Sequence, residues 1–207
     1  MSRAKSLLLL VALLLASACG SDSGGSPAQI DVQDDDGYAG TLLPRQYRLA
    51  PVTLGDTSDR PFTLARDDKD LDVVFFGYTN CPDVCRVVMA TIANAYLRLD
   101  EADRDRVRVV FVTTDPARDD ARELQAYLQR YNPDFTGLTG PLGKIDQLGK
   151  SMRIFITKGK KLPGGGYEVD HTTSVTAVRR GAASLVWTNG VAPQQMADDI
   201  TKLLEAS

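Results

Sequence analysis

Cysteine and histidine are scarce in this chain, which has three cysteines and one histidine among its 207 residues. Disulfide frameworks need more cysteines than this, so disulfides do not hold the fold together. Net charge is small as well, because 24 basic side chains stand against 27 acidic ones. This balance argues against nucleic acid as a partner. No internal repeat is present, and the cysteines and the histidine are the first candidates for specific chemistry.

Long apolar runs are also missing from the sequence. The run from Ser6 to Leu15 is too short to span a bilayer, for which a helix needs about 20 residues. Two basic residues, Arg3 and Lys5, precede this run, and small residues up to Ala18 follow it. A basic start, a short apolar run and a small-residue cleavage site predict a secretory signal peptide over residues 1–18.

Cys19 comes directly after the small residues and resembles the cysteine of a bacterial lipobox, although Ala16 stands where leucine is more usual. The resemblance implies cleavage before Cys19 and attachment of lipid to its thiol. The mature protein would then be tethered to the outer face of the cytoplasmic membrane, in an extracytoplasmic position. The alternative is a plain secreted protein with a free thiol near its N-terminus.

The mature chain divides into a linker and one domain. Residues 19–40 are rich in serine, glycine and aspartate, a composition that cannot bury a core and predicts a flexible linker. From about residue 41 the composition becomes that of a globular protein. Residues 41–207 are numerous enough to form a single well-buried domain.

The hydrophobic pattern of this domain alternates between strands and helices. Nearly continuous apolar runs predict strands buried on both faces at 71–78 and 107–113. Helices are predicted at 84–99, 118–131, 142–152 and 193–204. Further short strands are predicted at 47–54 and 62–64, at 153–157 before a Lys/Gly loop over 158–166, and as a hairpin at 173–179 and 184–188. The sequence therefore predicts an α/β fold, with a central mixed sheet flanked by helices and an added N-terminal hairpin.

The other two cysteines, Cys81 and Cys85, lie between the first buried strand and the helix that follows it. A disulfide between them would close a very small loop and constrain the unfolded chain little, so a purely structural bridge is a poor explanation. Positions i and i+4 share one face of a helix. Both sulfurs should therefore point the same way from the helix N-terminus, which favours anions and lowers the pKa of thiols.

His171, the only histidine, supplies a third donor group. Two thiolates and one imidazole suit a soft or borderline metal, copper above all. The same cysteines could instead serve thiol redox chemistry, with His171 an ordinary histidine that binds no metal. Met89 and Met152 are soft donors as well, but methionines at such positions more often fill the core.

Two aspartates are further candidates near this site. Asp115 ends a buried strand, where α/β sheets place their ligands, and could be an axial ligand or an outer hydrogen-bond acceptor. It could equally be a residue that caps the turn before Pro116. Asp170 precedes His171 and could orient the imidazole. Because neighbours on a strand point to opposite faces, Asp170 can do so only from a loop before the strand.

The order of elements, with a cysteine pair between the first buried strand and its helix, resembles the thioredoxin fold, although three residues rather than two separate the cysteines. Four blocks resemble the Sco/SenC family of copper proteins, in order and across the whole globular domain. These blocks are Phe76–Cys85, Thr114–Asp119, Gly137–Gly140 and Val169–His171. The resemblance implies a thioredoxin-like domain over residues 41–207.

The resemblance also implies that Cys81, Cys85 and His171 bind copper, as Cu(I) or Cu(II), and that the protein helps to build the dinuclear copper site (CuA) of cytochrome c oxidase. It therefore indicates a monomeric, membrane-tethered copper chaperone rather than an enzyme. Its partner would be cytochrome c oxidase subunit II or another copper acceptor. The alternatives are a thiol-disulfide oxidoreductase that reduces the cysteines of the acceptor, with Cys81 as nucleophile, and a copper or redox sensor.

The chain departs from the family pattern at two positions beside the cysteines. Asn80 stands where many members have histidine, and Arg86 stands where many have proline. Neither residue is one of the three implied ligands. A positive Arg86 could lower the pKa of the thiols and change the choice of partner.

Overall fold

The computed structural model describes residues 37–66, 69–161 and 167–206 of the chain. The strands are β1 (Thr41–Arg48), β2 (Leu54–Asp56), β3 (Pro61–Phe62), β4 (Leu71–Gly77), β5 (Val107–Thr113), β6 (Thr136–Thr139), β7 (Ile156–Lys161), β8 (Tyr167–His171), β9 (Val175–Arg179) and β10 (Ala182–Trp187). The helices are η1 (Leu64–Arg66), α2 (Val84–Tyr96), α3 (Glu101–Arg106), α4 (Ala121–Leu128), α5 (Leu142–Ser151) and α6 (Pro193–Glu205). Within these described ranges no helix is long and apolar enough to cross a membrane.

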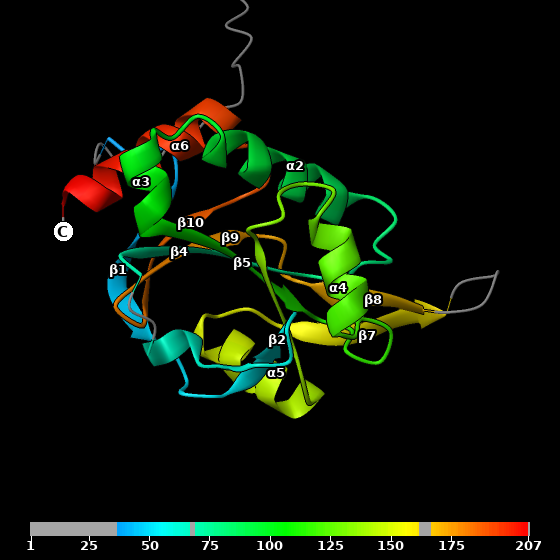
Figure 1. The fold of residues 1–207 in the computed structure, drawn as a ribbon. Helices are drawn as coiled ribbons and strands as arrows, with labels where there is room; N and C mark the ends of the chain where they lie inside the picture. Colours follow the sequence, from blue (N-terminus) through cyan, green and yellow to red (C-terminus); the bar gives the residue numbers. More distant parts are fainter. Residues whose placement is uncertain (1–36, 67–68, 162–166, 207) are drawn as a thin grey trace, which may run out of the picture. The chain divides into compact units, whose positions relative to one another are not determined.

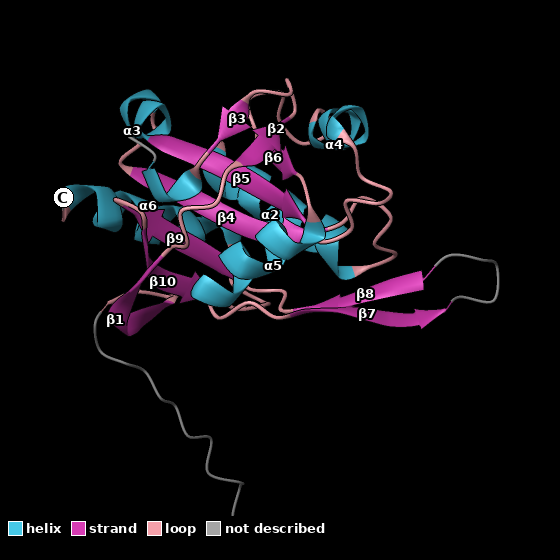
Figure 2. Cartoon of the chain, turned by 90° about the horizontal axis from the view of Figure 1, so that it is seen from below, coloured by secondary structure: helices cyan, strands magenta, loops and turns pink. Residues whose placement is uncertain are grey.

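Eight of the strands form one mixed sheet, in the order β1-β10-β9-β4-β5-β6-β2-β3 (Figure 2). Strands β4, β5 and β6 run parallel to one another, and the other pairs are antiparallel. All seven residues of β4 are buried. The buried strands predicted at 71–78 and 107–113 are therefore confirmed, and their runs are apolar because both faces of the central strands are covered.

Alternate residues of β4 pack into two separate hydrophobic clusters. Val73 and Phe75 pack in the cluster that contains the buried residues of α2 and α6. Val74 and Phe76 point to the opposite face, into the cluster of α5. Figure 1 shows the same layering, with α2 and α6 on one side of the sheet and α5 on the other. The expected architecture, a central mixed sheet flanked by helices, is confirmed.

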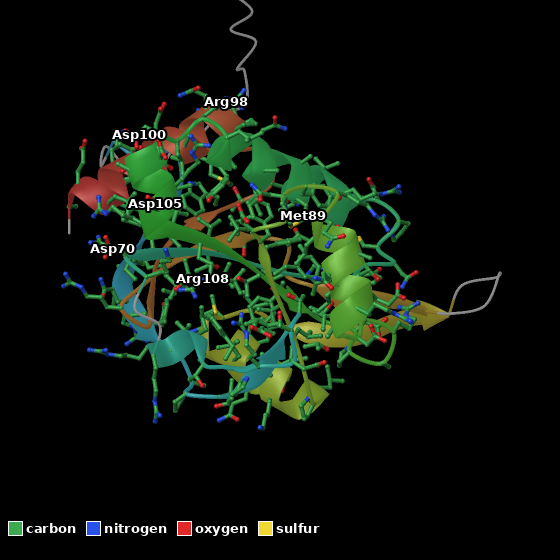
Figure 3. All side chains as sticks on the ribbon, in the orientation of Figure 1. Asp70, Met89, Arg98, Asp100, Asp105 and Arg108 are labelled. Carbon is green, nitrogen blue, oxygen red and sulfur yellow. The ribbon has the colours of Figure 1, made fainter. Side chains whose placement is uncertain are left out.

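Met89, Met152 and Trp187 pack in these cores. Met89, labelled in Figure 3, is fully buried in the cluster of α2 and α6, and Met152 is buried in the cluster of α5. Trp187 is 1% exposed and lies in the first cluster. The interpretation of the methionines as core residues therefore agrees with where they lie.

The N-terminal hairpin is present, but the strand predicted at 47–54 is wrong. Tyr47 and Arg48 end β1, which pairs with β10 at the edge of the sheet, whereas Leu54 begins β2, which pairs with β3. Pro51 falls between the two strands, and proline cannot donate a hydrogen bond to a ladder. The predicted signal peptide, Cys19 and most of the predicted linker lie outside the described residues.

The segment around His171 also differs from the sequence prediction. The loop expected over 158–166 is in part a strand, because β7 begins at Ile156 and continues to Lys161. It pairs with β8 in a separate two-stranded sheet, with Ile156 opposite His171. Figure 2 shows this ribbon extending away from the main sheet. Main-chain pairing with β8 makes this lysine- and glycine-rich segment a strand, which its side-chain pattern does not indicate.

The hairpin of β9 and β10 turns more tightly than predicted. Its turn consists of Arg180 and Gly181, both with positive φ (48° and 70°), so β10 already begins at Ala182. Two-residue turns of this kind match the twist of the strands. A Cβ on Gly181 would lie 2.2 Å from the carbonyl oxygen of Ala65, so only glycine fits here.

Asp199 anchors the first described residues to α6. Its carboxylate is 1% exposed and accepts the backbone N–H groups of Ala39 and Gly40 and the indole N–H of Trp187, at 2.8–3.1 Å. We expect Asp199→Ala to lower the free energy of unfolding by about 2–4 kcal/mol, because it leaves buried N–H donors without an acceptor. Asp199→Asn, which keeps one oxygen, should lose less. Urea denaturation followed by Trp187 fluorescence measures both losses, and an unchanged midpoint for Asp199→Ala would contradict this role.

Candidate metal centre

Cys81 and Cys85 lie where β4 ends and α2 begins. A turn from Tyr78 to Cys81 follows β4 and is closed by a hydrogen bond from the Cys81 N–H to the Tyr78 carbonyl, 3.2 Å long. Cys85 is the second residue of α2, whose N-cap residue Asp83 makes no side-chain capping bond. Instead the Cys85 N–H donates to Cys81 Sγ over 3.4 Å. The Cys81 sulfur therefore takes the place of a capping group at the positive end of α2.

His171 reaches the same place from the end of β8. Its Nε2 lies 3.8 Å from Cys85 Sγ. Its Nδ1 lies 3.0 Å from the Thr172 carbonyl oxygen, which can only accept, so Nδ1 is the donor in this contact and Nε2 is the nitrogen left to bind a metal. The edges of Phe75 and Tyr78 flank the ring, with centroids 6.2 and 6.1 Å away. The imidazole is thus held with its donor nitrogen facing the cysteines.

The two thiols differ sharply in acidity. The pKa of Cys81 falls to about 5, because the Cys85 thiol and the N–H groups of Asp83 and Cys85 donate to it and His171 is close. The pKa of Cys85 is raised, because its proton is shared with the Cys81 sulfur and because the side chain is fully buried. The expectation that the helix end lowers the pKa of both thiols is therefore wrong for Cys85. The lowered pKa of Cys81 and the raised pKa of Cys85 favour a thiolate on Cys81 rather than on Cys85.

A pocket of about 230 Å³ opens beside these groups. It is lined by Tyr78, Cys81, Pro82, Asp83, Val84, Val169, His171 and Thr173. Cys85 is not part of the lining, so a metal ion that enters meets Cys81 and His171 first. Two sulfurs and one imidazole are a donor set that suits copper. Among the described residues, no group of three such side chains is arranged as a finished metal site.

Asp115 does not line the pocket beside the cysteine pair. Its carboxylate forms an ion pair with Arg118, and its backbone carbonyl accepts the N–H groups of Arg118 and Asp119. It lines a different cavity, of about 650 Å³, together with residues of α5. Because the carboxylate pairs with a side chain, and only the backbone carbonyl accepts the N–H groups of the turn, the capping role and the ligand role of Asp115 both stay predictions.

Asp170 and Arg86 were also singled out from the sequence. Asp170 lies within β8, opposite Thr157, and not in a loop before the strand; its side chain lies outside the described part. The Nδ1 of His171 already has the Thr172 carbonyl as its partner. The guanidinium of Arg86 donates to the Pro82 carbonyl and is not among the main groups that lower the pKa of Cys81.

One residue of this region was not singled out from the sequence. Asp119 is fully buried, and its carboxylate accepts the N–H and the hydroxyl of Thr79 at 2.9 and 2.6 Å and the hydroxyl of Thr113 at 2.7 Å. Burial raises its pKa. The signal for it was present, because Asp119 ends the Thr114–Asp119 block, but the sequence pattern alone does not show which of the two aspartates in this block, Asp115 or Asp119, lies near the site.

The acidity of Cys81 can be measured directly. We expect alkylation of the reduced protein by iodoacetamide to modify Cys81 first, with a rate that rises through a midpoint near pH 5. A lowered pKa means that the thiolate persists above this pH and is lost only below it. Cys85→Ala removes the thiol donor and should move the midpoint up toward ordinary thiols, near 8.5. A wild-type midpoint near that ordinary value would contradict the capping arrangement.

The chain is similar to a known protein family and to several known proteins. The family model described as SCO1/SenC matches residues 44–205. A protein of Stutzerimonas stutzeri whose name includes the words copper-binding is 31% identical over 137 residues, which are 66% of this chain and 67% of that protein. The mitochondrial protein SCO2 of Saccharomyces cerevisiae is 28% identical over 123 residues, 59% of this chain and 41% of its own length. The chain thus spans less than half of this mitochondrial relative.

Solved structures share the fold. Sco1 of Thermus thermophilus, in its apo form, superposes with a TM-score of 0.68 at 28% identity, covering 82% of this chain and 96% of that one. Copper-bound ScoI of Bradyrhizobium japonicum superposes with a TM-score of 0.67 at 27% identity, covering 75% and 99%. The predicted thioredoxin-like α/β fold is confirmed. With a family model matched over most of its length, and with these relatives, the chain belongs to the SCO1/SenC family.

Proposed function

We propose that this protein binds copper through Cys81, Cys85 and His171 and passes it to an acceptor protein. The observation that carries the proposal is the position of His171, whose Nε2 lies 3.8 Å from Cys85 Sγ while Nδ1 faces the Thr172 carbonyl. A thiol reductase has no need of such an imidazole. Solved structures of two relatives, Bradyrhizobium japonicum ScoI and yeast Sco1, have copper bound, which supports the same metal here.

The difference in acidity sets the order of binding steps. Copper meets the Cys81 thiolate first, because this sulfur lines the pocket and is already deprotonated at neutral pH. The buried Cys85 thiol then releases its proton to solvent as its sulfur binds the metal. Release follows in reverse: a first acceptor thiolate bonds to copper as the bond to Cys85 breaks and Cys85 regains a proton. A second ligand of the acceptor then bonds to copper as the bond to Cys81 breaks, and Cys81 leaves as a thiolate. The copper keeps its oxidation state throughout, so no reductant is required.

We further propose the CuA site of cytochrome c oxidase subunit II as the acceptor, on the strength of the sequence blocks shared with the Sco/SenC family. The protein would work at the outer face of the cytoplasmic membrane, tethered through lipid on Cys19. A tether confines the domain to the surface where a membrane-bound acceptor lies, which raises its effective concentration. Mass spectrometry of the mature N-terminus tests the lipid attachment.

The acidity of the pair also supports a second candidate, a thiol-disulfide reductase. In that role the Cys81 thiolate attacks one sulfur of an acceptor disulfide and the other sulfur leaves as a thiolate. Cys85 then loses its proton and attacks Cys81, which releases the reduced acceptor and leaves a Cys81–Cys85 disulfide. A further dithiol donor must reduce this disulfide before the next turnover. The copper proposal needs no such donor.

Deleting the gene distinguishes the two candidates. For a copper chaperone, the deletion should lower cytochrome c oxidase activity severalfold, and added copper should restore part of it, because excess metal loads an acceptor that is already reduced. For a reductase, copper should do little, and a membrane-permeable thiol should rescue instead. Oxidase activity of membranes, measured with each supplement at matched growth, gives the answer. Rescue by the thiol alone would overturn the chaperone proposal.

A further inference from the structure

Asp119 connects the ends of three parallel strands beside the metal centre. Its carboxylate accepts from Thr79, which follows β4, and from Thr113, which ends β5. Its carbonyl accepts the hydroxyl of Thr139, which ends β6, over 2.9 Å. The carboxyl ends of parallel strands are where α/β sheets build their sites. Asp119 therefore forms hydrogen bonds with a residue at or just after the end of each of the three strands.

A buried carboxylate at this point is costly unless it is fully hydrogen-bonded. Asp119 is 0% exposed, and among the described residues it forms no ion pair with a lysine or arginine. Neutral donors alone compensate its burial, and two of the three come from Thr79. Hydrogen bonds to a charged acceptor are the strong ones. The interaction with Thr79 is therefore the main contact of this buried group.

Thr79 is the residue through which Asp119 reaches Cys81. It lies inside the turn that the Cys81 N–H closes onto the Tyr78 carbonyl. The side-chain amide of Asn80 donates to the Thr79 hydroxyl over 3.2 Å, so a short chain of hydrogen bonds runs from the turn to the buried carboxylate. Of the three donor residues, Cys81 alone lies outside a helix or strand, since Cys85 belongs to α2 and His171 to β8. Cys81 thus depends on this turn for its position.

We propose that Asp119 is a positioning residue of the metal centre, which holds the Thr79 turn so that the Cys81 sulfur faces His171 and the start of α2 before copper arrives. This inference rests on the proposed copper function. A ligand held in place beforehand loses less conformational freedom on binding and releases the metal more slowly. Changing a residue that orients a ligand typically lowers metal affinity about 10–100-fold.

Thr79 offers a matched pair of variants that leaves the buried carboxylate in place. Thr79→Val removes the hydroxyl with little change of shape, and Thr79→Ser keeps the hydroxyl and removes only a methyl group. We expect Thr79→Val to release copper about tenfold faster than the wild-type protein and to shift the thiolate-to-Cu(II) absorption band. Amide hydrogen exchange over residues 78–81 of the copper-free full chain should also become faster. Thr79→Ser should behave as wild type in all three measurements.

A control variant elsewhere in the fold distinguishes a positioning role at the metal centre from a purely structural one. Asp199→Asn weakens the hydrogen bonds of another buried aspartate. Asp199 accepts N–H groups of Gly40 and Trp187 and does not line the metal pocket. Both Asp199→Asn and Thr79→Val should lower the unfolding midpoint, and only Thr79→Val should shift the band. Wild-type release, band and exchange in Thr79→Val would overturn the inference. A wild-type chain that binds no copper would instead overturn the proposed function, and the exchange of residues 78–81 would still test the turn.

Discussion

The Cys81→Ser,Cys85→Ser double variant is expected to bind no copper under conditions in which the wild-type protein binds it stoichiometrically. Serine keeps the size of each side chain but replaces a soft thiolate by a hydroxyl, which is a poor ligand for copper. His171 alone cannot then hold the metal. We expect the affinity to fall by far more than the roughly hundredfold that follows the loss of an outer hydrogen bond. Equilibrium dialysis of the reduced proteins measures this loss.

The two single variants should slow copper uptake by unequal amounts. Cys81→Ser removes the sulfur that is already ionised and lines the pocket, so it should slow copper uptake most. Cys85→Ser leaves that thiolate in reach of solvent and should slow uptake less. Trp187, buried in the core, reports by its fluorescence whether each variant remains folded. Stoichiometric copper in a folded double variant would refute the assignment of the ligands.

His171→Ala is expected to lose Cu(II) while it keeps Cu(I). Two thiolates suffice for Cu(I), whereas Cu(II) favours the added nitrogen donor that Nε2 presents 3.8 Å from Cys85 Sγ. The thiolate-to-Cu(II) absorption band should disappear, and Cu(I) should still bind one per chain. At limiting copper, cells that carry this variant should resemble the deletion in oxidase activity, several times below wild type.

A neighbouring variant shows whether the imidazole itself is responsible. The side-chain amide of Asn189 donates to the Thr173 hydroxyl over 2.9 Å, so Asn189→Ala disturbs the segment next to His171 and leaves the imidazole intact. It should keep the Cu(II) band and the oxidase activity. Wild-type oxidase activity in His171→Ala cells would favour the reductase candidate, because that variant retains both thiols.

Much of the sheet follows from the sequence alone. The central strands β4 and β5 have nearly continuous apolar runs, and the helices α2, α5 and α6 have helical spacing of their apolar residues. The bounds of these elements agree with prediction to within a few residues. The six-residue helix α3 has no buried side chain and therefore no apolar pattern to find. Its start could have been recognised from Asp100, which caps the N–H of Asp103. The strand β6 is four residues long, too short for a periodic signal.

The candidate site was predictable in its members and not in its details. Spacing along the chain was enough to pair Cys81 with Cys85, and the rarity of histidine drew attention to His171. The unequal acidity of the two thiols depends on which sulfur is buried and which accepts N–H groups, and these are properties of three-dimensional packing. The same holds for Asp119, because the threonines that donate to its carboxylate and its carbonyl follow or end three strands that are distant from one another in sequence.

Copper titration of the reduced wild-type chain tests the central proposal most directly. We expect one copper per chain, with a thiolate-to-Cu(II) absorption band. At pH 8 we expect about one proton to be released per copper, because the pKa of Cys81 is lowered and that of Cys85 is raised, so that the proton of the pair is held by Cys85. Calorimetry in buffers of different ionisation heat counts that proton. Absence of the band, or copper that binds without the two thiols, would contradict the proposal that this protein carries copper at Cys81, Cys85 and His171.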